Sequence, residues 1–188
     1  MKKTSSSQKV FFVLFISALG FLVSIRLDST LKEFFMLHKS TTLDFLLSII
    51  TNFGLLAVIM LAIPSILLYK KNRKAVIALL VSSALSIILC SLLKILIQRP
   101  RPFLNSYHVT NALDYSFPSL HSAFVFSLLI PLYYFIPKKR YLWVSVAVLA
   151  SLSRVYFNVH YISDVVFGAL LGLLIGIFSV WLYENYPK

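Results

Sequence analysis

Three short segments of this 188-residue chain combine charged, hydroxyl and imidazole side chains at spacings that suit chemistry on an anion. The side chains in them that could act together on an anion are three cations, two histidines, a serine hydroxyl and a carboxylate. The segments are 94–102, 117–122 and 153–164. Each one adjoins an apolar stretch, and ionisable residues at the ends of such stretches are costly and usually functional.

The cations suit a phosphoryl group. During transfer its negative charge spreads over several oxygens, so stabilising it is mostly a matter of positioning and electrostatics. Lys94 offers a point charge, Arg101 offers a planar fork of donors that matches phosphate, and Arg154 adds a third cation. Pro100 and Pro102 disfavour a helix there, which lets Arg101 turn back over the end of the preceding apolar stretch.

The histidines supply a candidate nucleophile and a candidate acid. His160 and Asp164 are four residues apart and share a face if the chain is helical there. A carboxylate bound to one imidazole nitrogen fixes the tautomer and leaves the other nitrogen free to attack. His121 comes from another segment and suits a general acid that protonates the departing oxygen. Ser119 is a predicted N-cap, whose hydroxyl and neighbouring backbone N–H groups form an anion site.

Each of these residues has a simpler explanation when taken alone. A single histidine or arginine near an apolar stretch is more often an interfacial anchor, and Asp164 is equally a charge at a helix N-terminus. We interpret Arg99 as an anchor for lipid headgroups, His38 and His108 as surface residues, and Cys90 as a small buried hydrophobe. The simpler explanations weaken because the segments act together.

The composition predicts that lipid surrounds most of the chain. Hydrophobic residues make up 59% of it and charged residues 13%, which is more apolar surface than a soluble core of this size hides. The net charge of +12 does not indicate nucleic acid, because the basic residues form short clusters between apolar stretches. We predict one all-α domain over residues 1–188, an integral membrane bundle of six helices. The expected spans are about 10–25, 45–69, 75–97, 119–136, 141–157 and 162–183.

Two further features concern the first two spans. Asn52 and Gly54 interrupt the second one, whose apolar pattern is longer than one untilted crossing. Between the two spans, Thr30 and Glu33 have capping-box spacing, which predicts a separate interfacial helix.

The basic clusters predict the orientation, because cytoplasmic loops carry an excess of lysine and arginine. With six spans, three clusters fall on one side of the membrane, so we expect both termini in the cytoplasm and the three chemical segments outside. The protein is then a multi-pass protein of the cell membrane with an extracytoplasmic site. The clusters are Lys2, Lys3 and Lys9; Lys70, Lys71, Arg73 and Lys74; and Lys138, Lys139 and Arg140.

The three segments resemble the motifs of the type 2 phosphatidic acid phosphatase family, which are K-x6-R-P, P-S-G-H and S-R-x5-H-x3-D. The matching residues are Lys94, Arg101 and Pro102; Pro118, Ser119 and His121; and Ser153, Arg154, His160 and Asp164. The one departure is Leu120 in place of the glycine. Glycine lets backbone N–H groups approach a phosphate closely, whereas leucine keeps the N–H but adds bulk, so Leu120 is expected to narrow the pocket or alter the headgroup that fits.

The resemblance implies a role for each residue. His160 forms a phosphohistidine, Asp164 orients it, and His121 protonates the leaving group. The implied phosphate-binding residues are Lys94, Arg101, Ser119, Leu120 and Arg154. It implies no metal or other cofactor, and the sequence offers no carboxylate cluster suited to Mg²⁺.

The expected partners are the bilayer and a lipid phosphate, while the oligomeric state stays open. Undecaprenyl diphosphate and phosphatidylglycerophosphate are nearly even as substrates, with phosphatidic acid and a lipid A phosphate as further candidates. Two alternatives remain: a phosphotransferase that passes the group to another lipid, and a non-catalytic binder or transporter of lipid headgroups. The pair of His160 and Asp164 speaks against the binder, which needs cations but no oriented nucleophile.

Overall fold

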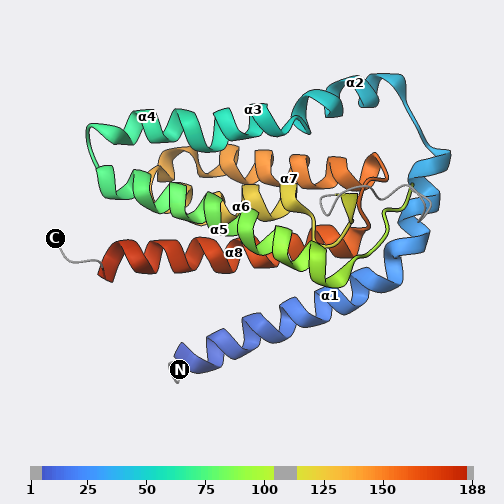
Figure 1. Ribbon diagram of the computed structural model, residues 1–188, viewed down its shortest axis with the longest axis horizontal. Coiled ribbons are helices and arrows are strands. Elements are labelled where there is room, and N and C mark those ends of the chain that lie inside the picture. Colours follow the sequence, from blue (N-terminus) through green and yellow to red (C-terminus); the bar gives the residue numbers. More distant parts are fainter. Residues whose placement is uncertain (1–5, 104–113, 186–188) are drawn as a thin grey trace.

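The computed structural model describes residues 6–103 and 114–185, with side chains from residue 19 onward, and every regular element in these ranges is helical (Figure 1). The all-α prediction is therefore confirmed. The elements are α1 (Ser6–Leu37), α2 (Thr41–Ile50), α3 (Phe53–Ala57), the π-helix η1 (Val58–Ala62), α4 (Ile63–Tyr69), α5 (Arg73–Ile97), α6 (Leu120–Phe135), the 3-10 helix η4 (Pro137–Lys139), α7 (Arg140–Tyr156) and α8 (Ile162–Asn185).

Several helices have the length and composition of membrane spans. Within the described ranges, α5 and α8 are long and apolar enough to cross a bilayer, and the bent run from α2 to α4 passes as a third crossing. The shorter helix α6 is also apolar. Many large apolar side chains on these helices are exposed, which a lipid environment explains because it gives them an apolar solvent. The structure is thus a membrane-embedded helical bundle.

The first helix corrects the prediction. α1 continues from Ser6 to Leu37, so the expected separate interfacial helix starting near Thr30 does not exist. No glycine or proline lies between Gly20 and Leu37, and nothing in that stretch forces the helix to end. Figure 1 shows that α1 instead changes direction along its length and turns across the end of the bundle.

The predicted interruption of the second span is confirmed. α2 and the run α3–α4 meet at an angle of 45° across Thr51 and Asn52. The side chain of Asn52 caps the new helix by accepting a hydrogen bond from the backbone N–H of Leu55 at 2.9 Å. Asparagine is a preferred N-cap, so it ends one helix and starts the next.

α6 lies at the centre of the packing and contacts α5, α7 and α8. Three glycines of α8, four residues apart, let the two backbones approach closely. A Cβ added at Gly168, Gly172 or Gly176 would lie 2.6, 2.5 or 2.7 Å from a backbone oxygen of α6. No side chain fits there, so glycine sets the distance between α6 and α8.

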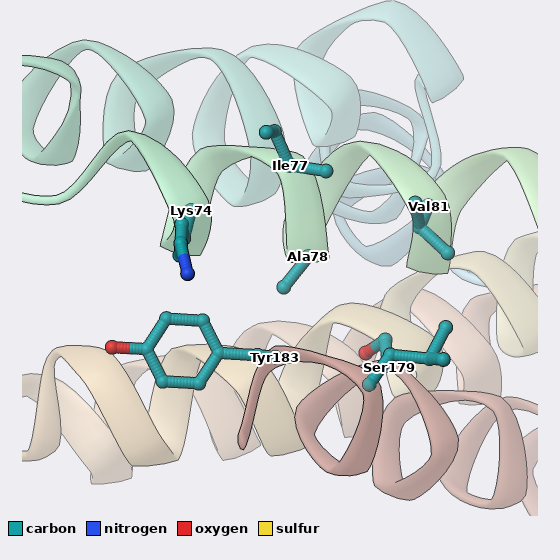
Figure 2. Close-up of a pocket in the computed structure, with 7 residues that line it drawn as sticks. Lys74, Ile77, Ala78, Val81, Ser179 and Tyr183 are labelled. Atoms are coloured by element: carbon teal, nitrogen blue, oxygen red, sulfur yellow. The ribbon is translucent and has the colours of Figure 1, made fainter. Parts of the chain in front are cut away.

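The two ends of α5 and α8 differ in character. The N-terminal part of α5 lies beside the C-terminal part of α8, and a cavity of about 260 Å³ lies between the two helices there. Figure 2 shows Lys74 and Tyr183 at one end of it, and Ser179 with aliphatic side chains along the rest. At the other end, α5 finishes beside the first turn of α8, where the three chemical segments lie.

Candidate active site

The three chemical segments meet at one end of the bundle, as predicted from the topology. Backbone contacts join them: Ser119 N–H donates to Asp164 O at 3.1 Å, and Ser116 N–H donates to Arg99 O at 2.7 Å. Gly168 reinforces the first contact because the absent side chain leaves room for Ser119 O. The segments from three different parts of the chain therefore form one cluster.

The start of α6 has the predicted N-cap. Ser119 is fully buried, and its Oγ accepts a hydrogen bond from Ser122 Oγ at 3.2 Å and a long one from Ser122 N–H at 3.5 Å. Leu120 is the first residue of α6 and is half-buried. Its φ is not positive, so this backbone makes no use of the freedom that glycine would add.

His160 lies in the loop between α7 and α8, not in a helix as the spacing argument assumed. Asp164 stands in the first turn of α8, and the fold still brings its Oδ2 to 3.5 Å from His160 Nδ1. This separation is too long for a hydrogen bond, and Nδ1 is buried without another partner. Burial lowers the pKa of His160 to about 4, although Asp164 opposes the shift. The imidazole is therefore neutral at ordinary pH, which a nucleophile requires.

The three predicted cations each donate a hydrogen bond to a neighbouring loop or helix break at this end of the bundle. Lys94 is 2% exposed and donates to Tyr115 O. Arg101 Nε donates to Asp114 O at 2.7 Å, and burial lowers the pKa of this guanidinium.

Arg154 and His121 share one anchor at the break between α2 and α3. Arg154 Nη1 donates to Thr51 Oγ1 at 2.6 Å, while its buried Nε has no partner in the described part of the chain. His121 Nε2 lies 3.0 Å from Thr51 O, and Phe53 meets the imidazole edge-on. A carbonyl oxygen only accepts, so His121 carries a proton on Nε2, and in the neutral ring Nδ1 is the acceptor.

Arg99 corrects an interpretation made from the sequence. It does not face lipid headgroups but lies between two carboxylates, Asp28 of α1 and Asp164 of α8. Sequence reasoning also missed Asp28, Ser163 and Thr51. Asp28 carried no clear signal in the sequence, because Lys32, four residues further along, was an available partner on the same helix.

The remaining predictions concern residues outside the cluster. His38 is exposed, as predicted, and stacks on Phe34. Cys90 is fully buried, as expected of a small hydrophobe. His108 lies outside the described residues. Within the described ranges no three histidine, cysteine, aspartate or glutamate side chains gather closely enough to hold a metal ion.

Comparison with known proteins gives the cluster a context. The model of the PAP2 superfamily matches residues 75–188, which contain all three segments. An undecaprenyl-diphosphatase of Sulfolobus acidocaldarius is 31% identical over 180 residues, covering 93% of this chain and 87% of that protein. A protein of Bacillus licheniformis named bacitracin transport permease protein BcrC is 34% identical over 115 residues, covering 59% of this chain and 57% of that one.

A solved structure shares the fold along most of the chain. It is the first transmembrane PAP2 type phosphatidylglycerolphosphate phosphatase from Bacillus subtilis, with a TM-score of 0.70 at 22% identity. The alignment covers 93% of this chain and 97% of that one. The likeness thus extends beyond the three segments to the helices that carry them.

Proposed function

The chain belongs to the PAP2 superfamily and is a membrane lipid phosphatase, and we propose that it cleaves its substrate through a phosphohistidine on His160 without a metal. The observation that carries this proposal is the contact between a buried neutral histidine and a carboxylate, at the same end of the bundle as three cations. Lys94, Arg101 and Arg154 balance the charge of a phosphoryl group in transfer, and the Ser119 cap and Leu120 N–H add donors at the start of α6.

The proposed reaction has two steps. First, His160 Nε2 attacks phosphorus, and the bond from phosphorus to the lipid oxygen breaks. His121 enters this step doubly protonated and gives that oxygen its Nδ1 proton, while its Nε2–H stays on Thr51 O. The Nδ1 proton of His160 faces Asp164, which stabilises the positive charge that forms on the ring. Second, water loses a proton to His121 and attacks the phosphohistidine, which releases phosphate and restores both histidines.

We propose undecaprenyl diphosphate or phosphatidylglycerophosphate as the substrate. Each is an acidic amphiphile whose headgroup suits the cationic cluster while its tail stays in lipid. The Sulfolobus relative carries the name of the first activity, and the Bacillus subtilis structure carries the name of the second. The two stay nearly even, because an apolar lining is no guide to the tail.

The proposed topology has six crossings with both termini in the cytoplasm and the site on the outer face. Its support is the placement of the basic clusters around Lys70 and Lys138, which lie at the end of the bundle opposite His160. The substrate then enters sideways from the outer leaflet.

Two other functions would use the same cluster. A phosphotransferase would pass the phosphoryl group from His160 to a second lipid instead of water. A transporter of headgroups gains support from the name of the Bacillus licheniformis relative. The transporter, however, gives no reason for a neutral histidine held against a carboxylate.

Phosphate release from purified protein in detergent, with EDTA present, tests the proposal. The panel contains undecaprenyl diphosphate, phosphatidylglycerophosphate, phosphatidic acid and lipid A, with no other lipid acceptor. We expect release despite EDTA, and a loss of at least about 10⁴-fold in His160→Ala. His38→Ala is the matched control, because His38 is exposed and lies outside the cluster.

The possible outcomes separate the alternatives. Release without an acceptor rules out an obligatory phosphotransferase. Full activity in His160→Ala would refute the histidine mechanism. An absence of release from every lipid, together with headgroup binding, would favour the transporter.

A further inference from the structure

The carboxylate of Asp28 lies far from the three motifs in sequence but makes three hydrogen bonds at the candidate active site. Its Oδ1 accepts from Ser163 N–H at 3.0 Å, and its Oδ2 accepts from Ser163 Oγ at 2.6 Å and from Arg99 Nη2 at 2.7 Å. The residue is 7% exposed. Ser163 belongs to the first turn of α8, so Asp28 places a negative charge at that helix N-terminus, where charge of this sign is favourable.

Arg99 connects this carboxylate to the one beside the nucleophile. Its Nη1 donates to Asp164 Oδ1 at 2.6 Å and to Ser163 Oγ at 2.7 Å, while Nη2 donates to Asp28. The guanidinium also lies over the ring of Tyr161, with Cζ 4.0 Å from the ring centre. A planar fork with a stacking face is a geometry that lysine does not offer, so Arg99 is held on three sides.

This arrangement fixes the rotation of the Asp164 carboxylate. Arg99 occupies Oδ1, and the backbone N–H of Tyr161 donates to Oδ2 at 2.9 Å. Oδ2 is the oxygen that faces His160 Nδ1. Asp164 is fully buried, so its orientation depends on these few partners.

The ionised states of Asp28, Arg99 and Asp164 also stabilise one another. One guanidinium lies between two carboxylates that are 7% and 0% exposed. Burial alone would lower the pKa of Arg99, but Asp164 and Asp28 outweigh it and raise that pKa. Without Arg99, the two buried carboxylates would keep only their hydrogen bonds to Ser163 and Tyr161 and would lack a compensating cation.

We propose that Asp28 is a positioning residue, which acts through Arg99 to hold Asp164 against His160 and so makes α1 part of the catalytic apparatus. This inference rests on the proposed function of His160. It extends the site to a helix that lies outside residues 75–188, the range matched by the family model.

The first test compares Asp28→Asn with Glu33→Gln. Both variants change a carboxylate of α1 to an amide, but Glu33 is exposed and has no role in the group described here. We expect Asp28→Asn to lower kcat by about 10- to 100-fold, the scale of one charge-assisted hydrogen bond, with KM changed less than about threefold. Glu33→Gln should match the wild type. Asp28→Asn with unchanged kcat would overturn the proposal.

A double-mutant cycle separates positioning from a general loss of structure. Arg99→Gln leaves Asp28 and Asp164 uncompensated, so it should lower kcat more than Asp28→Asn does. Adding Asp28→Asn removes one of the two carboxylates, and the double variant should be at least as active as Arg99→Gln alone. If the two losses simply multiply, Asp28 does not act through Arg99 and the proposal fails.

Two controls keep the result interpretable. If Asp28→Asn does not fold, Ser163→Ala removes the hydroxyl between Asp28 and Arg99 and should lower kcat by about threefold to tenfold. Full activity in that variant would overturn the proposal. Wild type and His160→Ala run in the same assay with undecaprenyl diphosphate and phosphatidylglycerophosphate, so a failure of the histidine mechanism is seen separately from a failure of the role of Asp28.

Discussion

The same two helices, α5 and α8, are polar at one end and apolar at the other. Lys94, near the close of α5, is 2% exposed and lies about 30 Å along the helix from Lys74, at 1.5 Å per residue. Lys74 borders the apolar cavity of Figure 2 and is half-buried. Among the described residues, all the buried side chains of Asp, Glu, Lys, Arg and His lie at the site end: Asp28, Lys94, His160 and Asp164.

The difference indicates why these charges are tolerated. A buried charge is costly unless it is paired, and at the site end each carboxylate has several donors. The cavity end has the exposed basic clusters of the predicted cytoplasmic face but no buried charge in its described part. Burial of charge therefore distinguishes the candidate active site from the opposite end of the bundle.

The largest effect expected in the comparison of the two ends comes from replacing one lysine at a time with methionine, an apolar residue of similar length. Lys94→Met should lower kcat/KM for lipid phosphate by about 10²- to 10³-fold, because it removes a cation that we propose stabilises the transferring group. Lys74→Met, on the same helix, should stay within about twofold. Equal losses in the two variants would contradict the contrast between the ends.

Glycine-to-alanine changes along α8 test the same difference between the two ends of the helix. Gly168→Ala and Gly176→Ala should each lower the free energy of unfolding by about 1–3 kcal/mol, because each Cβ meets a backbone oxygen of α6. Only Gly168 touches Ser119, so Gly168→Ala should also lower kcat by about tenfold, while Gly176→Ala should keep it. Thermal unfolding in detergent and phosphate release measure the two effects.

Gly20→Ala is the control for this pair, because nothing lies within 4 Å of a Cβ added there. It should leave activity unchanged and raise stability by up to about 1 kcal/mol, because alanine favours a helix over glycine. If Gly176→Ala loses as much activity as Gly168→Ala, the site is not sensitive to local packing in the way described.

Leu120→Gly should have a smaller effect. The half-buried side chain stands at the start of α6, where we expect its bulk to narrow the space for the headgroup. We expect its removal to change the ratio of rates for undecaprenyl diphosphate and phosphatidylglycerophosphate by about twofold to fivefold, at a cost in stability of about 1 kcal/mol. An unchanged ratio would show that Leu120 does not select the headgroup.

The smallest expected change is in the response to mild acid. His160 has a pKa of about 4, so it stays neutral between pH 7 and pH 5, and kcat/KM should lose less than about twofold from this group. A histidine with an ordinary pKa near 6.5 would lose about 30-fold at pH 5. A pH profile with its acid limb centred near 6.5 would show that burial does not control the nucleophile.

The same shift has a consequence for stability. The unfolded chain binds this proton near pH 6.5, whereas the folded chain binds it only near pH 4. Stability is therefore complete above about pH 6.5 and falls as the pH drops through this window. Thermal unfolding between pH 7 and pH 4 provides an independent measurement.

The sequence predicts the parts of the molecule that depend on local pattern. Apolar stretches gave helices near 75–97 and 162–183, and Asn52 and Gly54 marked a real break. Residue spacing also identified the pair of His160 and Asp164, although the chain between them is only partly helical. These features follow from neighbours in the sequence, which propensity and periodicity describe.

The sequence did not predict the contacts that join distant segments. Asp28 and Arg99 are 71 residues apart, and Thr51 lies 103 residues from Arg154. No periodicity links such pairs, so Arg99 was interpreted as an anchor for lipid. The prediction of a separate helix starting near Thr30 was also wrong. A capping-box pattern does not start a new helix when no residue ends the preceding one.

The bend at Thr51 frees a backbone carbonyl oxygen that the candidate active site uses. Within lipid, a carbonyl oxygen released from a helix must find another donor, so an interruption is normally a liability. Here Thr51 O meets His121 Nε2, and the hydroxyl of the same residue meets Arg154. In a straight helix, that carbonyl oxygen would accept a hydrogen bond from a backbone N–H. It would then not be available to fix the tautomer of the His121 imidazole. A substitution that straightens the helix at Thr51 to gain stability would therefore remove the acceptor that determines which nitrogen of His121 carries the proton.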